Sequence, residues 1–187
     1  MDSVEHLTDE EVLKHSLKER NFFAHLIGRY ETKLRAYIGR KSNASPSDQD
    51  DILQNVFIKV YKNMKEFDQS LRFSSWIYRI CYNEMIDWYR KKKREPSVSF
   101  DADETILHSL TSTDDTSSVA LHEEQKTLLK KALSALDKKY QDIIELRFYE
   151  EKSYEEIADI LQIPPGTVAI HLNRAKKILK DLLHHHE

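Results

Sequence analysis

Apolar residues recur every three or four positions along most of this chain, which is the spacing of one face of an α-helix. The first such stretch lies within residues 9–38. Its apolar positions are Leu17, Phe22, Phe23, Leu26, Ile27, Tyr30, Leu34, Tyr37 and Ile38. We predict two helices here, the longer from about residue 21 to residue 40.

A second helix is predicted after the polar turn at residues 41–47, with Ser47 as its N-cap and acidic residues in its first turn. Its buried face is expected to be Ile52, Leu53, Val56, Phe57, Val60, Tyr61 and Met64. Its outward face would then carry Asp51, Gln54, Asn55, Lys59 and Lys62. Such a polar row is either simply solvated or a contact surface for another protein.

Residues 71–94 combine many aromatic side chains with a terminal run of cations from Arg90 to Arg94. We predict a polar loop over residues 67–75, with Ser74 or Ser75 capping a long helix. The inward stripe is expected at Ile77, Ile80, Cys81, Glu84 or Met85, and Trp88. A second face aligns Trp76, Arg79, Asn83, Asp87 and Arg90.

Two interpretations of this helix remain open at the level of the sequence. Its charged face could be a surface ion-pair network on an ordinary amphipathic helix. Alternatively, exposed aromatics and cations are the groups that bind unstacked bases and phosphates of single-stranded nucleic acid.

Composition changes abruptly over residues 95–125, which contain no Lys or Arg but many acidic, Ser and Thr residues. Such a segment buries too little apolar surface to order itself, and we predict an extended acidic linker. The linker divides the chain into a domain at residues 8–94 and a domain at residues 126–183.

Helical spacing returns after the linker, first at Leu128, Leu129, Ala132, Leu133 and Leu136 and then at Tyr140, Ile143, Ile144 and residues 146–148. Ser153 and Glu156 form a capping-box pattern at the start of a short helix. A turn at residues 162–166 follows, with Pro165 at the first position of the last helix. The inner face of that helix would be Val168, Leu172, Ala175, Leu179 and Leu182.

A short capped helix, a tight turn and a second helix are typical of a helix-turn-helix. The outward face of the second helix carries Thr167, Ala169, Ile170, His171, Asn173, Arg174 and Lys177. These types suit base edges, a thymine methyl group and phosphates in duplex DNA. A helical hairpin that packs against protein is the alternative interpretation.

Composition narrows the class of protein further. The chain of 187 residues has only three glycines and four prolines, which disfavours a β-sandwich or barrel. Cys81 is its single cysteine, so a disulfide framework is excluded. The histidines are scattered and give no metal motif, and we assign no function to the run at residues 184–186. The N-terminus lacks a secretory signal and no run of 18 apolar residues occurs, so we expect a cytoplasmic protein without membrane insertion.

The motifs together resemble the extracytoplasmic-function (ECF) sigma factors, members of the sigma-70 family of bacterial RNA polymerase subunits. The resemblance spans residues 21–183. In the first domain it rests on the run from Asp51 to Phe57 and on Trp76, Tyr78-Arg79-Ile80, Asn83, Ile86-Asp87 and Arg90. In the second domain it rests on Leu146-Arg147-Phe148, Tyr154-Glu155-Glu156-Ile157-Ala158, Gly166-Thr167-Val168 and Arg174-Ala175.

The resemblance implies an all-α fold of two small helical domains joined by the acidic linker, the second a helix-turn-helix. It implies core RNA polymerase as partner, with Asp51, Gln54, Asn55 and Lys59 on the clamp helices of the largest subunit and a further contact at the flap. It also implies double- and single-stranded promoter DNA and an anti-sigma factor as partners. Since the polymerase would make the RNA, we expect no catalytic residues and no cofactor in this chain. The linker would imitate the charge of nascent RNA in the polymerase.

Site residues follow from the same resemblance. The minus-10 element would be melted and read by Phe73, Ser74, Trp76, Arg79, Asn83, Arg90, Lys91, Lys92, Lys93 and Arg94. A pocket for an unpaired base would be formed by the loop at residues 67–75 together with Asn83. The minus-35 element would be read by Thr167, Ala169, Ile170, His171, Asn173, Arg174 and Lys177. Family members often carry a basic residue, Ser or Thr, and Arg after Gly-Thr-Val, where this chain has Ala169-Ile170-His171.

Two other classes of protein account for fewer of these sequence features. A free-standing helix-turn-helix regulator of duplex DNA would leave the outward row at Asp51, Gln54 and Asn55 without a role. A helical metal-dependent hydrolase would need clustered histidines and carboxylates, which the sequence lacks.

Overall fold

The computed structural model describes residues 4–94 and 119–184, and every regular element within these ranges is helical. The helices form two compact units, one built mainly by α1–α4 and the other mainly by α5–α8. This confirms the predicted all-α fold with two helical domains, and each unit is described by itself.

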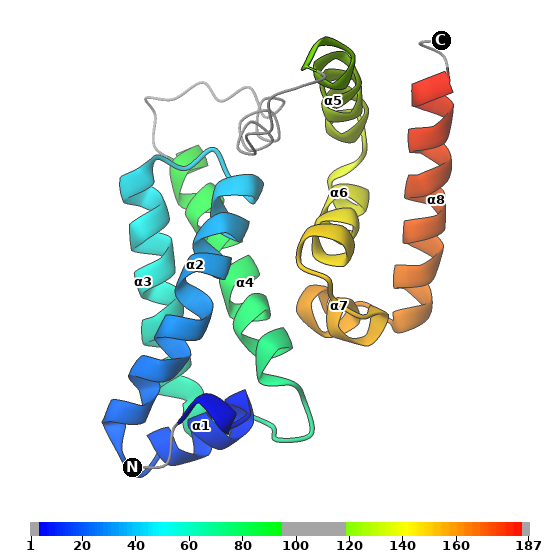
Figure 1. Ribbon diagram of the computed structural model, residues 1–187. Helices are drawn as coiled ribbons and strands as arrows, with labels where there is room; N and C mark the ends of the chain where they lie inside the picture. The colour runs from blue at the N-terminus through cyan, green and yellow to red at the C-terminus, as the bar shows by residue number, and fades with distance from the viewer. Residues whose placement is uncertain (1–3, 95–118, 185–187) are drawn as a thin grey trace. The chain divides into compact units, whose positions relative to one another are not determined.

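The first unit contains α1 (Asp9–Ser16), α2 (Phe23–Lys41), α3 (Pro46–Asn63) and α4 (Phe73–Arg94). Short 3-10 turns, η1 to η3, lie at Val4–His6, Arg20–Phe22 and Met64–Glu66. Figure 1 shows α2, α3 and α4 running alongside one another, with α1 across the end at which α4 begins.

The core of this unit is built by the apolar stripes that the sequence predicts. Ring contacts join α2 to α3 through Phe23 and Tyr61, at 5.2 Å, and α2 to α4 through Tyr37 and Tyr78, at 5.3 Å. The fully buried side chains include Val12, Leu26, Leu34, Tyr37, Ile38, Val56, Val60, Ile77 and Cys81. Trp88, predicted to be buried, is partly exposed, with Lys92 over its ring at 5.9 Å.

Two predicted helix starts in this unit are wrong by a few residues. Ser45, not Ser47, is the N-cap of α3, because Pro46 occupies the first helical position and the Ser45 hydroxyl accepts from the Asp48 N–H at 3.2 Å. Helix α4 begins at Phe73, so Ser74 and Ser75 lie in its first turn rather than capping it. The preceding loop is therefore shorter than predicted.

The second unit contains α5 (Val119–Ser134), α6 (Lys138–Ile144), α7 (Tyr154–Leu161) and α8 (Pro165–His184), with a π-helical turn, η4, at Glu145–Tyr149. Helices α5 and α6 both pack against α8. The buried side chains include Leu133, Leu136, Tyr140, Ile143, Leu146, Ile157, Val168, Leu172 and Ala175. Phe148 was predicted to continue the apolar stripe but is exposed, because the π-helical turn shifts its direction.

The predicted helix-turn-helix is confirmed in detail. Ser153 caps α7 in a capping box, with the Glu156 carboxylate accepting from the Ser153 N–H at 2.9 Å. Helix α7 ends at Gln162 in the left-handed region, with φ 56° and ψ 45°, and the Ile163 N–H donates to the Ala158 carbonyl at 3.1 Å. Pro165 then begins α8 as predicted.

Helix α5 begins at Val119, several residues before the predicted start of the second domain. The rest of the predicted acidic linker, residues 95–118, and the terminal histidines at residues 185 and 186 lie outside the described residues. Within the described parts of the chain, no helix has the length and apolar character needed to cross a bilayer.

Candidate nucleic-acid interface

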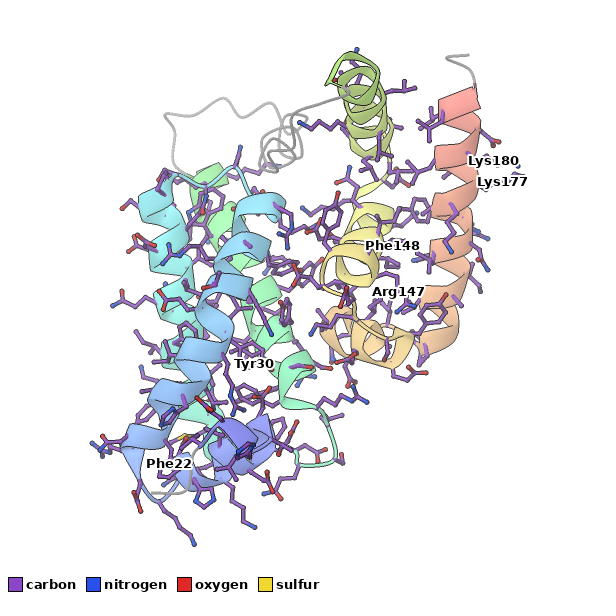
Figure 2. The ribbon with its side chains drawn as sticks, viewed as in Figure 1. Phe22, Tyr30, Arg147, Phe148, Lys177 and Lys180 are labelled. Atoms are coloured by element: carbon purple, nitrogen blue, oxygen red, sulfur yellow. The ribbon has the colours of Figure 1, made fainter. Side chains whose placement is uncertain are left out.

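An aromatic cluster fixes the first turn of α4. The ring of Phe73 lies 5.4 Å from Tyr30, 6.0 Å from Phe67 and 5.8 Å from Trp76, and its side chain is 0% exposed. The prediction that Phe73 contacts DNA is therefore wrong, because the ring is enclosed on all sides by the core. Tyr30 reaches this cluster from α2 (Figure 2).

The loop between η3 and α4 is held at both ends by this cluster, through Phe67 and Phe73. Inside the loop, the Asp68 carboxylate accepts from the Ser70 N–H at 2.9 Å, and the Leu71 N–H donates to the Asp68 carbonyl at 3.0 Å. The Ser70 N–H lowers the pKa of the Asp68 carboxyl group. The loop is thus a constrained turn with exposed polar side chains.

A pocket of about 620 Å³ opens beside this loop, within the size range of small-molecule sites. Its wall is shared by the loop, the start of α4, α2 and the first turn of α1. The lining residues are Thr8, Asp9, Glu10, Arg29, Gln69, Ser70, Leu71, Arg72 and Ser74. Two carboxylates and two guanidinium groups balance in formal charge, which suits an uncharged polar group such as a nucleobase.

Asn83 does not line this pocket, contrary to the prediction. It lies ten residues after Phe73, about 15 Å along the axis of α4. Asn83 and Arg90 are exposed, while Trp76 and Arg79 are partly exposed. The basic residues Lys91, Lys92, Lys93 and Arg94 form the last turn of α4. The predicted DNA-binding face is therefore a strip along α4 that begins near the pocket and ends at these cations.

Ion pairs occupy part of this strip. Arg90 lies 3.5 Å from Asp87, and Lys59 of α3 lies 3.9 Å from the same carboxylate. Lys59 also pairs with the buried carboxylate of Glu84. Lys59, predicted to bind polymerase, thus also links α3 to α4, because Glu84 needs a nearby cation in the core, and 48% of the Lys59 side chain remains exposed.

The exposed face of α3 carries Asp51, Gln54 and Asn55, as predicted from the apolar spacing. Ile58 lies on the same face with 42% of its side chain exposed. An apolar side chain among polar neighbours is typical of a protein contact. The sequence pattern did not single out Ile58, although it breaks the polar row at helical spacing.

The outer face of α8 exposes Ile170, Asn173, Arg174 and Lys177, and 53% of Ile170 is accessible. Lys177 lies on the side of α8 that faces away from α6 (Figure 2). Thr167 and Ala169 are partly exposed.

His171 is partly exposed, but one side of its ring faces the core. Its ring packs edge-on against the buried Tyr140 at 5.5 Å, and its Nδ1 atom is enclosed. Nδ1 is therefore turned toward the core, and the base contact predicted for His171 would fall to Nε2.

A groove that the sequence analysis missed lies on the second unit. It is lined by Leu129, Leu133, Ile144, Phe148, Tyr149, Lys176, Leu179, Lys180 and Leu183. Phe148 is 55% exposed, and the Lys176 ammonium lies 5.7 Å above its ring. Such an exposed apolar groove with basic edges indicates a protein contact. The sequence placed Leu129, Leu133 and Leu179 on apolar stripes but did not show that they line an open groove.

Among the described residues, no cluster of histidine, cysteine and carboxylate side chains has the arrangement of a metal site. The two helical units, the helix-turn-helix, the basic end of α4 and the polar pocket define a two-domain DNA-binding protein.

Comparison with known proteins identifies the family. Residues 26–95 match the family model of sigma-70 region 2, and residues 126–179 match that of sigma-70 region 4. The ECF RNA polymerase sigma factor SigW of Bacillus subtilis is 32% identical over 173 residues, with 88% of this chain and 90% of the relative covered. The ECF RNA polymerase sigma-E factor of Escherichia coli is 29% identical, with 94% of each chain covered.

The chain belongs to the sigma-70 family as an ECF RNA polymerase sigma factor, a DNA-binding transcription initiation factor that directs promoter-specific transcription. The alternative of a free-standing regulator is not favoured, because both sigma regions and nearly the whole chain match.

Two solved structures have a similar fold. The sigma factor RpoE of Bartonella quintana, in complex with the anti-sigma factor NepR, is 26% identical with a TM-score of 0.61, covering 87% of this chain and 96% of that one. CnrH, in complex with the cytosolic domain of CnrY, is 20% identical with a TM-score of 0.66, covering 96% and 99%.

Proposed function

We propose that the first unit opens and reads the minus-10 element along α4. The observation that carries this proposal is the polar pocket at the start of α4, which continues into an exposed strip ending in five consecutive basic residues. Helix α4 has 22 residues and is about 33 Å long, which is enough for several nucleotides of one strand. The terminal cations bind the phosphate backbone, Asn83 and Arg79 contact bases along the strip, and the pocket takes one unpaired base.

Trapping an unpaired base in a pocket accounts for strand opening. Unpairing and flipping a base costs a few kcal/mol. Contacts in a pocket and stacking return about 1–3 kcal/mol per base. Ser74, in the pocket wall, and Trp76, at the start of the strip, border the first nucleotides.

The second unit reads the minus-35 element through α8. Ile170 suits a thymine methyl group, Asn173 suits an adenine edge, and Arg174 and Lys177 suit guanine or phosphates. Thr167, at the start of α8, donates to a phosphate. Ala169 is small enough to let the helix approach the bases closely.

Two surfaces bind core polymerase in this proposal. The row at Asp51, Gln54, Asn55 and Ile58 contacts the clamp helices of the largest subunit, with Ile58 as the apolar centre of a polar contact. The groove around Phe148 on the second unit binds the polymerase flap. The site of action is the cytoplasm, where core polymerase and promoter DNA are found.

An anti-sigma factor is a further proposed partner, because the similar RpoE structure contains the anti-sigma factor NepR. Such a partner would compete with polymerase for the exposed face of α3 or for the groove on the second unit.

Two asparagine variants test the division of labour between the units. The full chain is mixed with bacterial core polymerase and a library of promoters randomised in both elements, and the transcripts are sequenced. Asn83→Ala is expected to relax preference in the minus-10 element alone. Asn173→Ala, the matched control, is expected to relax preference in the minus-35 element alone.

The proposal fails if both variants change the same element, or if neither changes any preference. Transcription that does not depend on adding the chain to core polymerase would also contradict it.

A further inference from the structure

The wall of the pocket is completed by α1, a helix that precedes the region-2 match at residues 26–95. Helix α1 packs against α4, and its first turn supplies two carboxylates that reach other elements. These tertiary contacts make α1 a part of the pocket even though it stands outside the matched region.

Asp9 fastens α1 to α2. Its carboxylate accepts from Arg29 Nη1 at 2.7 Å and from the Tyr30 hydroxyl. Arg29 Nη2 also donates to the Val4 carbonyl at 2.9 Å, which holds the segment before α1 in place. Burial and the Asp9 carboxylate raise the pKa of Tyr30, so its hydroxyl stays protonated as the donor. The position of the first turn of α1 is therefore fixed by α2.

Glu10, the next residue, fastens α1 to α4. Its carboxylate accepts from the Phe73 N–H at 2.8 Å. Phe73 is the first residue of α4, so Glu10 satisfies one of the four backbone donors that a helix start leaves free. The acceptor thus comes from a helix 63 positions away along the chain, while the loop side chain Asp68 is bonded to Ser70.

This contact lies where the loop joins the helix. Phe73 is held on its other side by the aromatic cluster, and Gln69, Ser70, Leu71 and Arg72 lead directly into it. Loss of the Glu10 contact would release the Phe73 N–H and let the start of α4 fray. The loop side chains that line the pocket would then shift with it.

We infer that Glu10 is a positioning residue for minus-10 recognition: it holds the loop at residues 68–72 in the shape that accepts one unpaired base. This inference rests on the proposed function of the pocket. It assigns to α1 a role in promoter selection that acts through α4 and the loop, without contact between Glu10 and polymerase.

The test uses the full chain with core polymerase and a promoter library randomised at each minus-10 position, with strand opening measured by permanganate reactivity. Glu10→Ala is expected to lower discrimination about fivefold at one minus-10 position, as for the loss of one helix cap. Preference at the other positions and affinity for core should stay the same. Glu10→Gln keeps an oxygen that accepts from Phe73 and should retain most of the discrimination.

Ser45→Ala is the matched control, because it removes an N-cap of the same unit on a helix that does not line the pocket. It should lower the melting temperature as Glu10→Ala does and leave the minus-10 profile unchanged. Two results would overturn the inference by showing a purely structural contact. One is an equal loss of discrimination at every minus-10 position in Glu10→Ala, and the other is a minus-10 preference profile in Ser45→Ala that matches that of Glu10→Ala. If the unmodified chain shows no minus-10 preference, the proposed function itself fails, which is a separate result.

Discussion

Substituting Phe73 distinguishes a role in the buried core from a role in DNA contact, and it tests the aromatic cluster directly. Truncating a buried phenylalanine to alanine costs about 3–5 kcal/mol, a large part of the stability of a small unit. Phe73→Leu is milder, because it keeps apolar volume and loses the ring contacts with Tyr30, Phe67 and Trp76. Since an aromatic pair contributes about 0.5–1.5 kcal/mol beyond burial, the expected loss is about 1–2 kcal/mol.

The chain carries its own reporter for this loss. Its two tryptophans, Trp76 and Trp88, both lie in α4, so tryptophan fluorescence follows the unfolding of the first unit. With a urea dependence of about 1–2 kcal/mol per molar, Phe73→Leu should lower the unfolding midpoint by about 1 M. Promoter opening by the folded variant, measured well below that midpoint, should fall far less than stability does, because the backbone N–H of residue 73 keeps its contact with Glu10.

The opposite pattern would refute the burial of Phe73. If Phe73→Leu keeps the urea midpoint and instead lowers promoter opening, the ring faces DNA and the core assignment is wrong. Ser153→Ala is a suitable control for the reporter, because it alters the second unit and should leave the tryptophan signal unchanged.

Three further predictions concern the caps, the charges and the loop. Ser153→Ala should lower the free energy of unfolding of the second unit by about 1 kcal/mol, measured by far-ultraviolet circular dichroism, and weaken binding to minus-35 DNA. Lys177→Ala should weaken duplex binding for all sequences and reduce the slope of log affinity against log salt by about 1. The lowered pKa of Asp68 means that its contribution to stability is full above the ordinary carboxyl pKa and is lost as pH falls through the lowered value. Relative to Asp68→Asn, the unmodified chain should therefore lose urea stability below about pH 4; a constant difference would contradict this.

Local sequence determined the elements wherever a cap or a periodic stripe was strong. Ser153 and Glu156 predicted the start of α7, and Pro165 predicted the start of α8, because both signals act within a few residues. The start of α3 was misassigned, since Ser45 and Ser47 are equally good caps and only the position of Pro46 separates them. The start of α4 was missed because its cap, Glu10, comes from a distant part of the chain.

The candidate site likewise has features that the local sequence predicts and features that depend on tertiary contacts. The spacing of polar residues correctly predicted that Asp51, Gln54, Asn55, Asn83, Asn173 and Lys177 are exposed. It could not tell that Lys59 pairs with Glu84, that Phe73 is enclosed, or that His171 turns toward Tyr140. Each of these depends on which residue of another helix lies opposite, and helical period alone does not contain that information.

By itself, the sequence determined that this protein is helical, that it has two domains, that its second domain carries a helix-turn-helix and that its motifs resemble those of sigma factors. Periodicity, caps and charge clusters are local, and they act in any tertiary context. Only the tertiary structure decided the lining of the polar pocket, because that pocket joins α1, α2 and the loop before α4. The pairing of Glu10 with Phe73 spans 63 positions of the chain, and packing alone brings the two together.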